Sequence, residues 1–120
     1  MEHILCQLTD IVDGDALAFD HANGEPGAPG LFVVREGEKA YCYVNDCPHL
    51  HITLDFVPGR FMNKRSGVIQ CANHGARFQI GNGQCIWGPC KGDALTSLPI
   101  QIANGAVILK ASARVDVATK

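Results

Sequence analysis

Residues 47–75 read CPHLHITLDFVPGRFMNKRSGVIQCANHG and contain two short pairs of cysteine and histidine. One residue separates Cys47 from His49, two separate Cys71 from His74, and 21 residues lie between the pairs. Proline or glycine stands beside each pair, which predicts loops. Two thiols and two imidazoles at these spacings can meet at one metal centre, either tetrahedral zinc or a [2Fe-2S] cluster with two histidines on one iron.

Short apolar runs separated by turn formers surround these pairs and predict an all-β chain. The turn signals include Glu36-Gly37 and Asn104-Gly105. No apolar pattern of helical period persists for three turns. Within residues 39–44, alternation predicts Tyr41 and Tyr43 on the face opposite Cys42. The expected strands are residues 4–8, 16–19, 31–34, 39–44, 68–70, 78–80, 84–87, 98–102 and 106–110.

Length and composition predict one globular domain over residues 1–120, with an exposed loop at 20–30 and a loose tail at 111–120. The net charge of −2 argues against a uniformly basic nucleic-acid binder, and the sequence lacks an apolar run long enough to span a membrane. Ten acids and two bases fall in residues 1–55, against two acids and eight bases in residues 56–120. The first residues lack the pattern of an export signal, so we expect a cytoplasmic protein.

The chain resembles the Rieske-type ferredoxins and related Rieske [2Fe-2S] domains. The resemblance rests on Cys47-Pro48-His49, Cys71-Ala72-Asn73-His74-Gly75, Phe78, Gly83 and Gly88-Pro89. It implies an antiparallel β-sandwich with a small cluster-binding subdomain of loops and short strands at about residues 45–94. It further implies one [2Fe-2S] cluster per chain.

Carried over residue by residue, the resemblance implies that Cys47 and Cys71 bind the buried iron. It assigns His49 and His74 to the outer iron, and Pro89 to a loop that covers the cluster. The family pattern gives His51 no ligand role, so we expect it to be a surface histidine.

The sequence departs from the family pattern at several positions. The spacer between the pairs is long, and we expect the excess in an inserted turn at residues 57–67. Ile52 and Asn73 stand where respiratory members have disulfide-forming cysteines, which implies that this bond is missing. Ala76 and Phe78 stand where those respiratory members have Ser and Tyr hydroxyls that donate hydrogen bonds to the cluster. Fewer donors lower the potential, so we expect one near the lower end of the range of roughly −150 to +300 mV.

The other cysteines and the tryptophan are expected to be structural. Cys6, Cys42 and Trp87 are predicted to lie in the core, with Trp87 alternatively packed under the cover loop, and Cys85 and Cys90 are predicted to be buried reduced thiols. Alternatively, Cys85 and Cys90 line the cluster cover or pair across the turn. Three bases are expected to form a solvated turn or to dock an acidic partner: Arg60, Lys64 and Arg65.

The leading functional hypothesis is a soluble one-electron carrier, with no substrate chemistry of its own, that passes electrons from a ferredoxin reductase to a terminal oxygenase or other redox enzyme. The chain is too short for a complete Rieske oxygenase, and it lacks a glycine-rich nucleotide-binding motif. One alternative is a small electron-transfer subunit of a larger complex, similar to the small subunit of assimilatory nitrite reductase. Another is a structural zinc module.

Overall fold

The computed structural model describes residues 3–19, 30–46, 54, 61–63, 65–71, 75–88 and 92–110. The tail expected at 111–120 and all but Gly30 of the loop expected at 20–30 lie outside these residues. The described part is almost entirely β, which confirms the predicted fold class. Its strands are β1 (His3–Gln7), β2 (Ala16–Phe19), β3 (Leu31–Glu36), β4 (Lys39–Val44), β5 (Met62–Asn63), β6 (Val68–Gln70), β7 (Arg77–Phe78), β8 (Cys85–Trp87), β9 (Ser97–Leu98), β10 (Ile100–Ala103) and β11 (Ala106–Leu109). A single 3-10 turn, η1 (Leu8–Asp10), follows β1.

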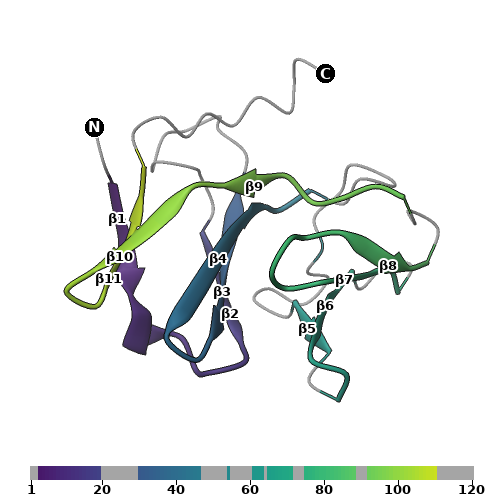
Figure 1. Cartoon of the computed structure of the whole chain (residues 1–120), viewed down its shortest axis with the longest axis horizontal. Helices are drawn as coiled ribbons and strands as arrows, with labels where there is room; N and C mark the ends of the chain where they lie inside the picture. The colour runs from purple at the N-terminus through teal and green to yellow at the C-terminus, as the bar shows by residue number, and fades with distance from the viewer. Residues whose placement is uncertain are drawn as a thin grey trace.

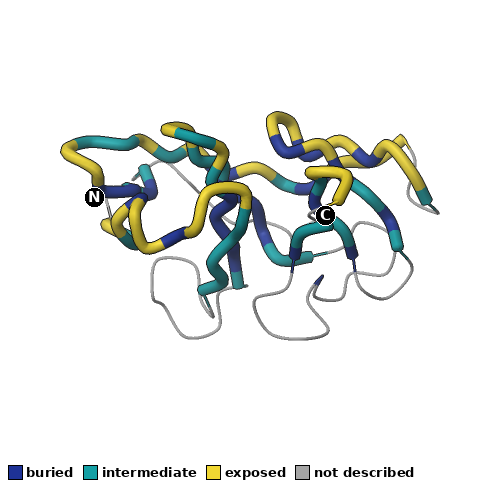
Figure 2. The backbone as a smooth tube through the Cα atoms, turned by 90° about the horizontal axis from the view of Figure 1, so that it is seen from below, coloured by how far each residue is buried: buried dark blue, intermediate teal, exposed yellow. Residues whose placement is uncertain are grey.

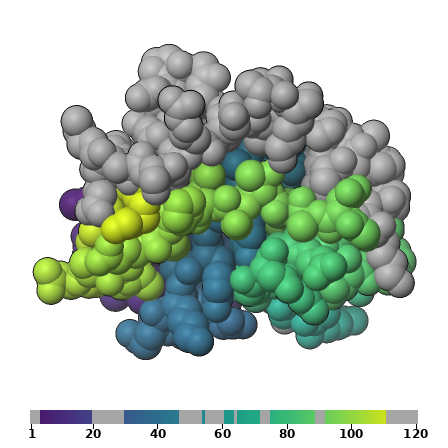
Figure 3. Space-filling view, turned by 45° about the horizontal axis from the view of Figure 1, so that its top comes forward, coloured from purple at the N-terminus to yellow at the C-terminus, as the bar shows by residue number. Residues whose placement is uncertain are grey.

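The strands form three antiparallel sheets, which lie side by side from left to right in Figure 1. The outer sheet has the strand order β1-β11-β10, and the central sheet has the order β2-β3-β4-β9. The small sheet has the order β5-β6-β7-β8 and comes from one continuous segment of the chain. In Figure 3 the small sheet, in teal and green, forms one side of the molecule next to the blue of the central sheet.

The central sheet is covered on both faces, and β3 explains how. Leu31 and Val33 belong to the apolar core shared with the outer sheet, whereas Phe32 and Val34 belong to the core shared with the small sheet. All four side chains are completely buried. Successive strand residues point to opposite faces, so a run of four apolar residues suits a strand buried on both sides. Figure 2 shows short buried stretches alternating with exposed ones along the chain.

β4 follows the predicted alternation. Cys42 and Val44 lie in the core against the outer sheet, while Tyr43 lies in the core against the small sheet and Tyr41 packs beside it. The ring of Phe32 stacks on Phe61 with 4.3 Å between centroids, which links β3 directly to the start of β5. This core therefore fixes the small sheet against the central one.

Several predicted strand ends are displaced by one or two residues, and three differences have a clear structural cause. The segment 98–102, predicted as one strand, is divided at Pro99 into β9 in the central sheet and β10 in the outer sheet. Proline has no N–H to continue a ladder, and here the chain changes sheets. The first hairpin turns at Gly37-Glu38, one residue later than predicted, because Glu36 still pairs with Lys39.

The third difference lies in the inserted segment 57–67. Its described part contains a strand, β5, that pairs with β6 and adds an edge to the small sheet. Asn63 supports the following turn, because its Oδ1 accepts a hydrogen bond from the Ser66 N–H at 3.2 Å. Within the described residues, no helix is long and apolar enough to cross a membrane.

Candidate metal centre

One of the four predicted ligands lies within the described residues. Cys71 directly follows β6 and is completely buried. Cys47, His49 and His74 lie outside the described residues, as do His51, Pro89 and Cys90. Among the residues that the structure describes, no three His, Cys, Asp or Glu side chains gather to form a metal site.

The described residues on either side of the first predicted ligand segment are held together. Asn45 directly follows β4, and its side-chain Oδ1 accepts a hydrogen bond from the Leu54 N–H at 2.8 Å. The Asn45 N–H donates to the Gly30 carbonyl at 2.9 Å. Leu54 is completely buried and belongs to the same apolar core as Cys71. The segment that carries Cys47 and His49 therefore begins and ends next to the core that contains Cys71.

The second predicted ligand segment is closed by backbone hydrogen bonds. The Cys71 N–H donates to the Ala76 carbonyl at 2.8 Å, and the Gly75 N–H donates to the Cys71 carbonyl at 3.0 Å. These bonds continue the pairing of β6 with β7, in which Gln70 faces Arg77. The ladder fixes where the segment begins and ends, so Cys71 and Gly75 have defined positions.

The residue after β8 packs directly on this segment. A Cβ atom added at Gly88 would lie 2.8 Å from the Ala76 Cα, and the φ angle of Gly88 is +108°. A side chain at this position would collide with the backbone in a conformation that L-residues avoid. The predicted Gly-Pro cover thus begins in contact with the second ligand segment, although Pro89 itself lies outside the described residues.

The residues at the positions of the respiratory members' hydroxyl donors are apolar and buried. Ala76 and Phe78 have no exposed surface. Neither side chain has a donor group. The buried hydroxyl of Tyr43 donates to the Ile80 carbonyl, which ties β4 to the turn after β7.

The structure corrects the prediction for Trp87, because 56% of this side chain is exposed. The cause is an irregularity in the pairing of β7 with β8, where Phe78 faces Cys85 and Arg77 faces Trp87. Ile86 is the extra residue, so Trp87 does not return to the buried side occupied by Cys85. A β-bulge redirects side chains in this way, but it has no simple signature in the sequence.

Arg77 lies under the exposed Trp87 and was not singled out by its sequence context. The guanidinium carbon lies 5.3 Å from the centroid of the indole ring. The Arg77 Nε is buried and forms no hydrogen bond with any described residue. The indole also reaches the second ligand segment, because a Cβ added at Gly75 would lie 3.5 Å from it. Cationic and aromatic side chains thus stand beside the residue that follows His74.

The remaining described cysteines are buried or half-buried. Cys85 is buried, and its thiol contacts the Trp87 carbonyl at 3.4 Å. Burial, followed by the nearby Cys6, raises the pKa of the Cys42 thiol to about 12. Burial, followed by the charge of Asp10, raises the pKa of Cys6 to about 11. Cys6 and Cys42 therefore remain protonated at neutral pH, unlike thiols that act as nucleophiles.

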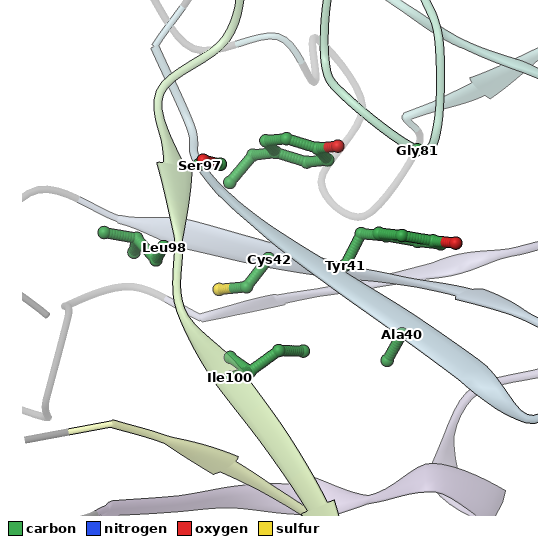
Figure 4. Close-up of a pocket in the computed structure, with 8 residues that line it drawn as sticks. Ala40, Tyr41, Cys42, Gly81, Ser97, Leu98 and Ile100 are labelled. Atoms are coloured by element: carbon green, nitrogen blue, oxygen red, sulfur yellow. The ribbon is translucent and has the colours of Figure 1, made fainter.

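A small surface hollow lies elsewhere, between β4 and the segment from β9 to β10. It has a volume of about 110 Å³, and its lining includes Tyr41, Gly81, Ser97 and Ile100. Figure 4 shows Tyr41 on one side of the β4 ribbon and Cys42 on the other, toward Leu98. The hollow has no group of metal-ligating side chains, so it does not compete with the Cys71 segment as a metal site.

The described residues fit an iron–sulfur group. A buried cysteine at a loop closed by two backbone hydrogen bonds suits a thiolate ligand that is kept from water. The donor set of two cysteines and two histidines suits a [2Fe-2S] cluster with mixed ligation.

Comparison with known proteins agrees with this chemistry. The Rieske [2Fe-2S] domain family matches residues 2–103. A chain from the complex of reduced oxygenase and oxidised ferredoxin in carbazole 1,9a-dioxygenase has a similar fold, with a TM-score of 0.71, 22% identity, and coverage of 96% of this chain and 97% of that chain. The ferredoxin of Sphingomonas yanoikuyae B1 matches with a TM-score of 0.68 and 24% identity. The match covers 92% of this chain and 98% of that chain.

A larger protein shares the fold over part of its length. The terminal oxygenase of carbazole 1,9a-dioxygenase from Nocardioides aromaticivorans IC177 is 18% identical with a TM-score of 0.71, covering 95% of this chain and 31% of that chain. No curated protein sequence matches the chain. Because the family match spans most of the sequence, the chain belongs to the Rieske [2Fe-2S] domain family, whose cofactor is a [2Fe-2S] cluster.

Proposed function

We propose that this protein is a one-electron carrier that passes electrons from a ferredoxin reductase to a terminal oxygenase or another redox enzyme. The observation that carries the proposal is the family match over residues 2–103. The ferredoxin from Sphingomonas yanoikuyae B1, which resembles this chain over 98% of its own length, supports it. The carbazole dioxygenase complex, which combines an oxygenase with a ferredoxin, supports the choice of partner.

Four residues hold the cluster in this proposal: Cys47, His49, Cys71 and His74. When bound, a [2Fe-2S] cluster takes up and releases a single electron. The protein supplies thiolate and imidazole ligands, and the buried surroundings of Cys71 exclude water from its sulfur. The chain performs no substrate chemistry of its own. We assign residues 45–94 to the cluster-binding subdomain.

Two further features belong to the proposal. The side chains of Ala76 and Phe78 cannot donate hydrogen bonds, which favours a potential at the lower end of the Rieske range. We also infer a cytoplasmic location. A reducing compartment suits Cys6 and Cys42, which form no disulfide.

The test is an absorption and EPR spectrum of the purified protein before and after reduction with dithionite. We expect a coloured protein whose reduced form gives the anisotropic signal of a histidine-ligated [2Fe-2S] cluster. A Cys71→Ser variant should lose that signal, while Cys42→Ser, which alters a buried thiol in the other core, should keep it. A colourless wild-type protein with stoichiometric zinc would overturn the proposal in favour of a structural zinc module.

A further inference from the structure

The small sheet presents an unusual exposed surface beside the second ligand segment. Ile86 is 40% exposed and Trp87 is 56% exposed, although both belong to strand β8. The bulge opposite Arg77 accounts for this, because it presents two consecutive large apolar residues to solvent. Exposed aromatic residues of this kind are enriched where proteins bind one another.

This surface belongs to a segment of the chain whose charged residues are all basic. Residues 57–92 contain five bases and no acid, and the next acid in the sequence is Asp93. The small sheet, β5 to β8, is formed entirely within this segment. Arg65 is exposed at the turn between β5 and β6, and Arg77 lies under Trp87. The small sheet is therefore positive, although the whole chain has a net charge of −2.

The arrangement of Arg77 indicates that its charge is held in place. The guanidinium lies within cation–π distance of the indole, and the Nε of Arg77 is removed from solvent. Stacking on an aromatic ring restrains an arginine while keeping its positive charge. A fixed cation beside an exposed tryptophan suits a contact face that offers carboxylates around an apolar patch.

We propose that the face formed by Arg77, Ile86 and Trp87 is the docking surface for a redox partner whose contact face is acidic and partly apolar. The proposal rests on the electron-carrier function above. It commits to an acidic partner because the small sheet is the positively charged part of a chain that is negative overall. A Cβ atom added at Gly75, the neighbour of His74, would lie 3.5 Å from the Trp87 indole, so docking here brings the partner next to the second ligand segment.

The test measures electron transfer from the dithionite-reduced protein to two haem proteins of opposite charge, acidic cytochrome b5 and basic cytochrome c. One electron leaves the carrier, and the ferric haem iron of the acceptor becomes ferrous. Stopped-flow rates are measured at ionic strengths of about 0.01 M and about 0.15 M, between which the screening length falls from about 30 Å to about 8 Å. We expect the rate with cytochrome b5 to fall as salt rises, by about tenfold.

Three variants separate the contributions to docking. Arg77→Gln should slow the reaction with cytochrome b5 about threefold at low salt, and Trp87→Ala should slow it about tenfold at both salt concentrations. Trp87→Phe, which keeps an aromatic ring, should recover most of the rate. The matched control is Lys39→Gln, which removes the same charge from an exposed position on β4 and should leave the rate unchanged.

The controls distinguish failure of docking from failure of the proposed function. Each variant must keep the EPR signal and reduction potential of the wild type. A wild-type protein with no reducible cluster contradicts the carrier function itself. A reducible protein whose Arg77 and Trp87 variants react like the wild type contradicts the docking surface alone. A wild-type dimer in sedimentation velocity that Trp87→Ala converts to monomer would assign the face to a second copy and also overturn the proposal.

Discussion

At the scale of single residues, the tightest constraint near the candidate site is the contact between Gly88 and Ala76. Gly88 combines a positive φ angle with a backbone contact that leaves no space for a Cβ atom. Gly92 has a similar φ angle of +103° but has open space where its Cβ would lie. Substituting each glycine by alanine therefore separates two contributions to stability: the strain of a positive φ angle, which both positions share, and the collision with Ala76, which only Gly88 has.

The first prediction compares Gly88→Ala with Gly92→Ala. The Gly92 variant should lower the free energy of unfolding by about 1 to 2 kcal/mol, through backbone strain alone. Gly88→Ala should lose a further 1 to 3 kcal/mol, roughly, because Ala76 must move. Urea unfolding followed by circular dichroism measures both values, and the iron content of each purified variant shows whether the displaced segment still retains the cluster. Equal losses for the two variants would mean that Ala76 can move away from the added methyl group without lowering the free energy of unfolding.

The second prediction concerns the buried thiol of Cys42, whose pKa is raised from 9.0 to about 12. The unfolded chain loses this proton at a lower pH than the folded chain does. The stability associated with the protonated thiol is therefore complete below pH 9.0 and is lost as pH rises toward about 12. The slope reaches at most about 1.4 kcal/mol per pH unit for this one group.

Chemical unfolding of the wild type and of Cys42→Ala between about pH 8 and about pH 11 tests this dependence. We expect the variant to be less stable at the lower pH because of the cavity, and to lose less stability as pH rises. Using the difference between the two proteins removes any pH effect of the cluster that they share. Parallel pH profiles would show that Cys42 does not ionise on unfolding.

At the scale of elements, most strands of the central and outer sheets could be predicted from the sequence, since local pattern determines them, but the division into β9 and β10 could not. The run Leu31 to Val34 and the turn at Asn104-Gly105 are examples, and Asn104 has the positive φ angle that this turn requires. β5 could not be predicted, because a strand of two residues has no periodicity and exists through its pairing with β6. The exposure of Trp87 depends on a bulge between β7 and β8, which is a property of two strands together.

The candidate site shows the same division. The four ligand positions were predicted from spacing and family resemblance, and all four stay predictions, because the structure describes Cys71 but not the other three. The structure adds two contacts that spacing cannot show. The Leu54 N–H donates a hydrogen bond to the Asn45 side chain, and Gly88 packs against the backbone of Ala76. Both depend on contacts between residues far apart in the sequence.

The third prediction tests the link between the central sheet and the small sheet. The Tyr43 hydroxyl on β4 donates to the Ile80 carbonyl, and Tyr43→Phe leaves that buried carbonyl without this donor. We expect a loss of about 1 to 3 kcal/mol in the free energy of unfolding. Tyr41→Phe is the matched control, because Tyr41 lies half-buried on the same face of β4 and should lose less than about 0.5 kcal/mol. Similar losses in both variants would show that the hydrogen bond contributes little.

At the scale of the whole molecule, the fold preserves the uneven distribution of charge along the chain. A β-sandwich can interleave distant segments and so mix their charges. Here the small sheet is built from residues 62–87 alone, a segment without acids, while exposed acids lie on the central sheet, with Glu36 at the end of β3 and Asp13 and Glu38 on turns. Among the described residues, the small sheet and its turn therefore carry positive charge, and the sheet adjoins the second ligand segment through Cys71.

The fourth prediction uses small inorganic oxidants, which report the charge next to the site where the electron leaves. The reduced protein is oxidised by anionic hexacyanoferrate(III) or by cationic hexaammineruthenium(III), at ionic strengths from about 0.01 M to about 0.15 M. If the net charge of −2 governed the reaction, salt would accelerate oxidation by the anion and slow oxidation by the cation. We expect the reverse for both oxidants, because the charge near the small sheet is positive.

The double variant Glu36→Gln/Glu38→Gln, which raises the net charge by two, should leave these salt effects unchanged. The double variant Arg65→Gln/Arg77→Gln, which lowers the net charge by two, should reduce or invert them. Salt effects that follow the net charge in all three proteins would mean that the electron leaves through another part of the surface.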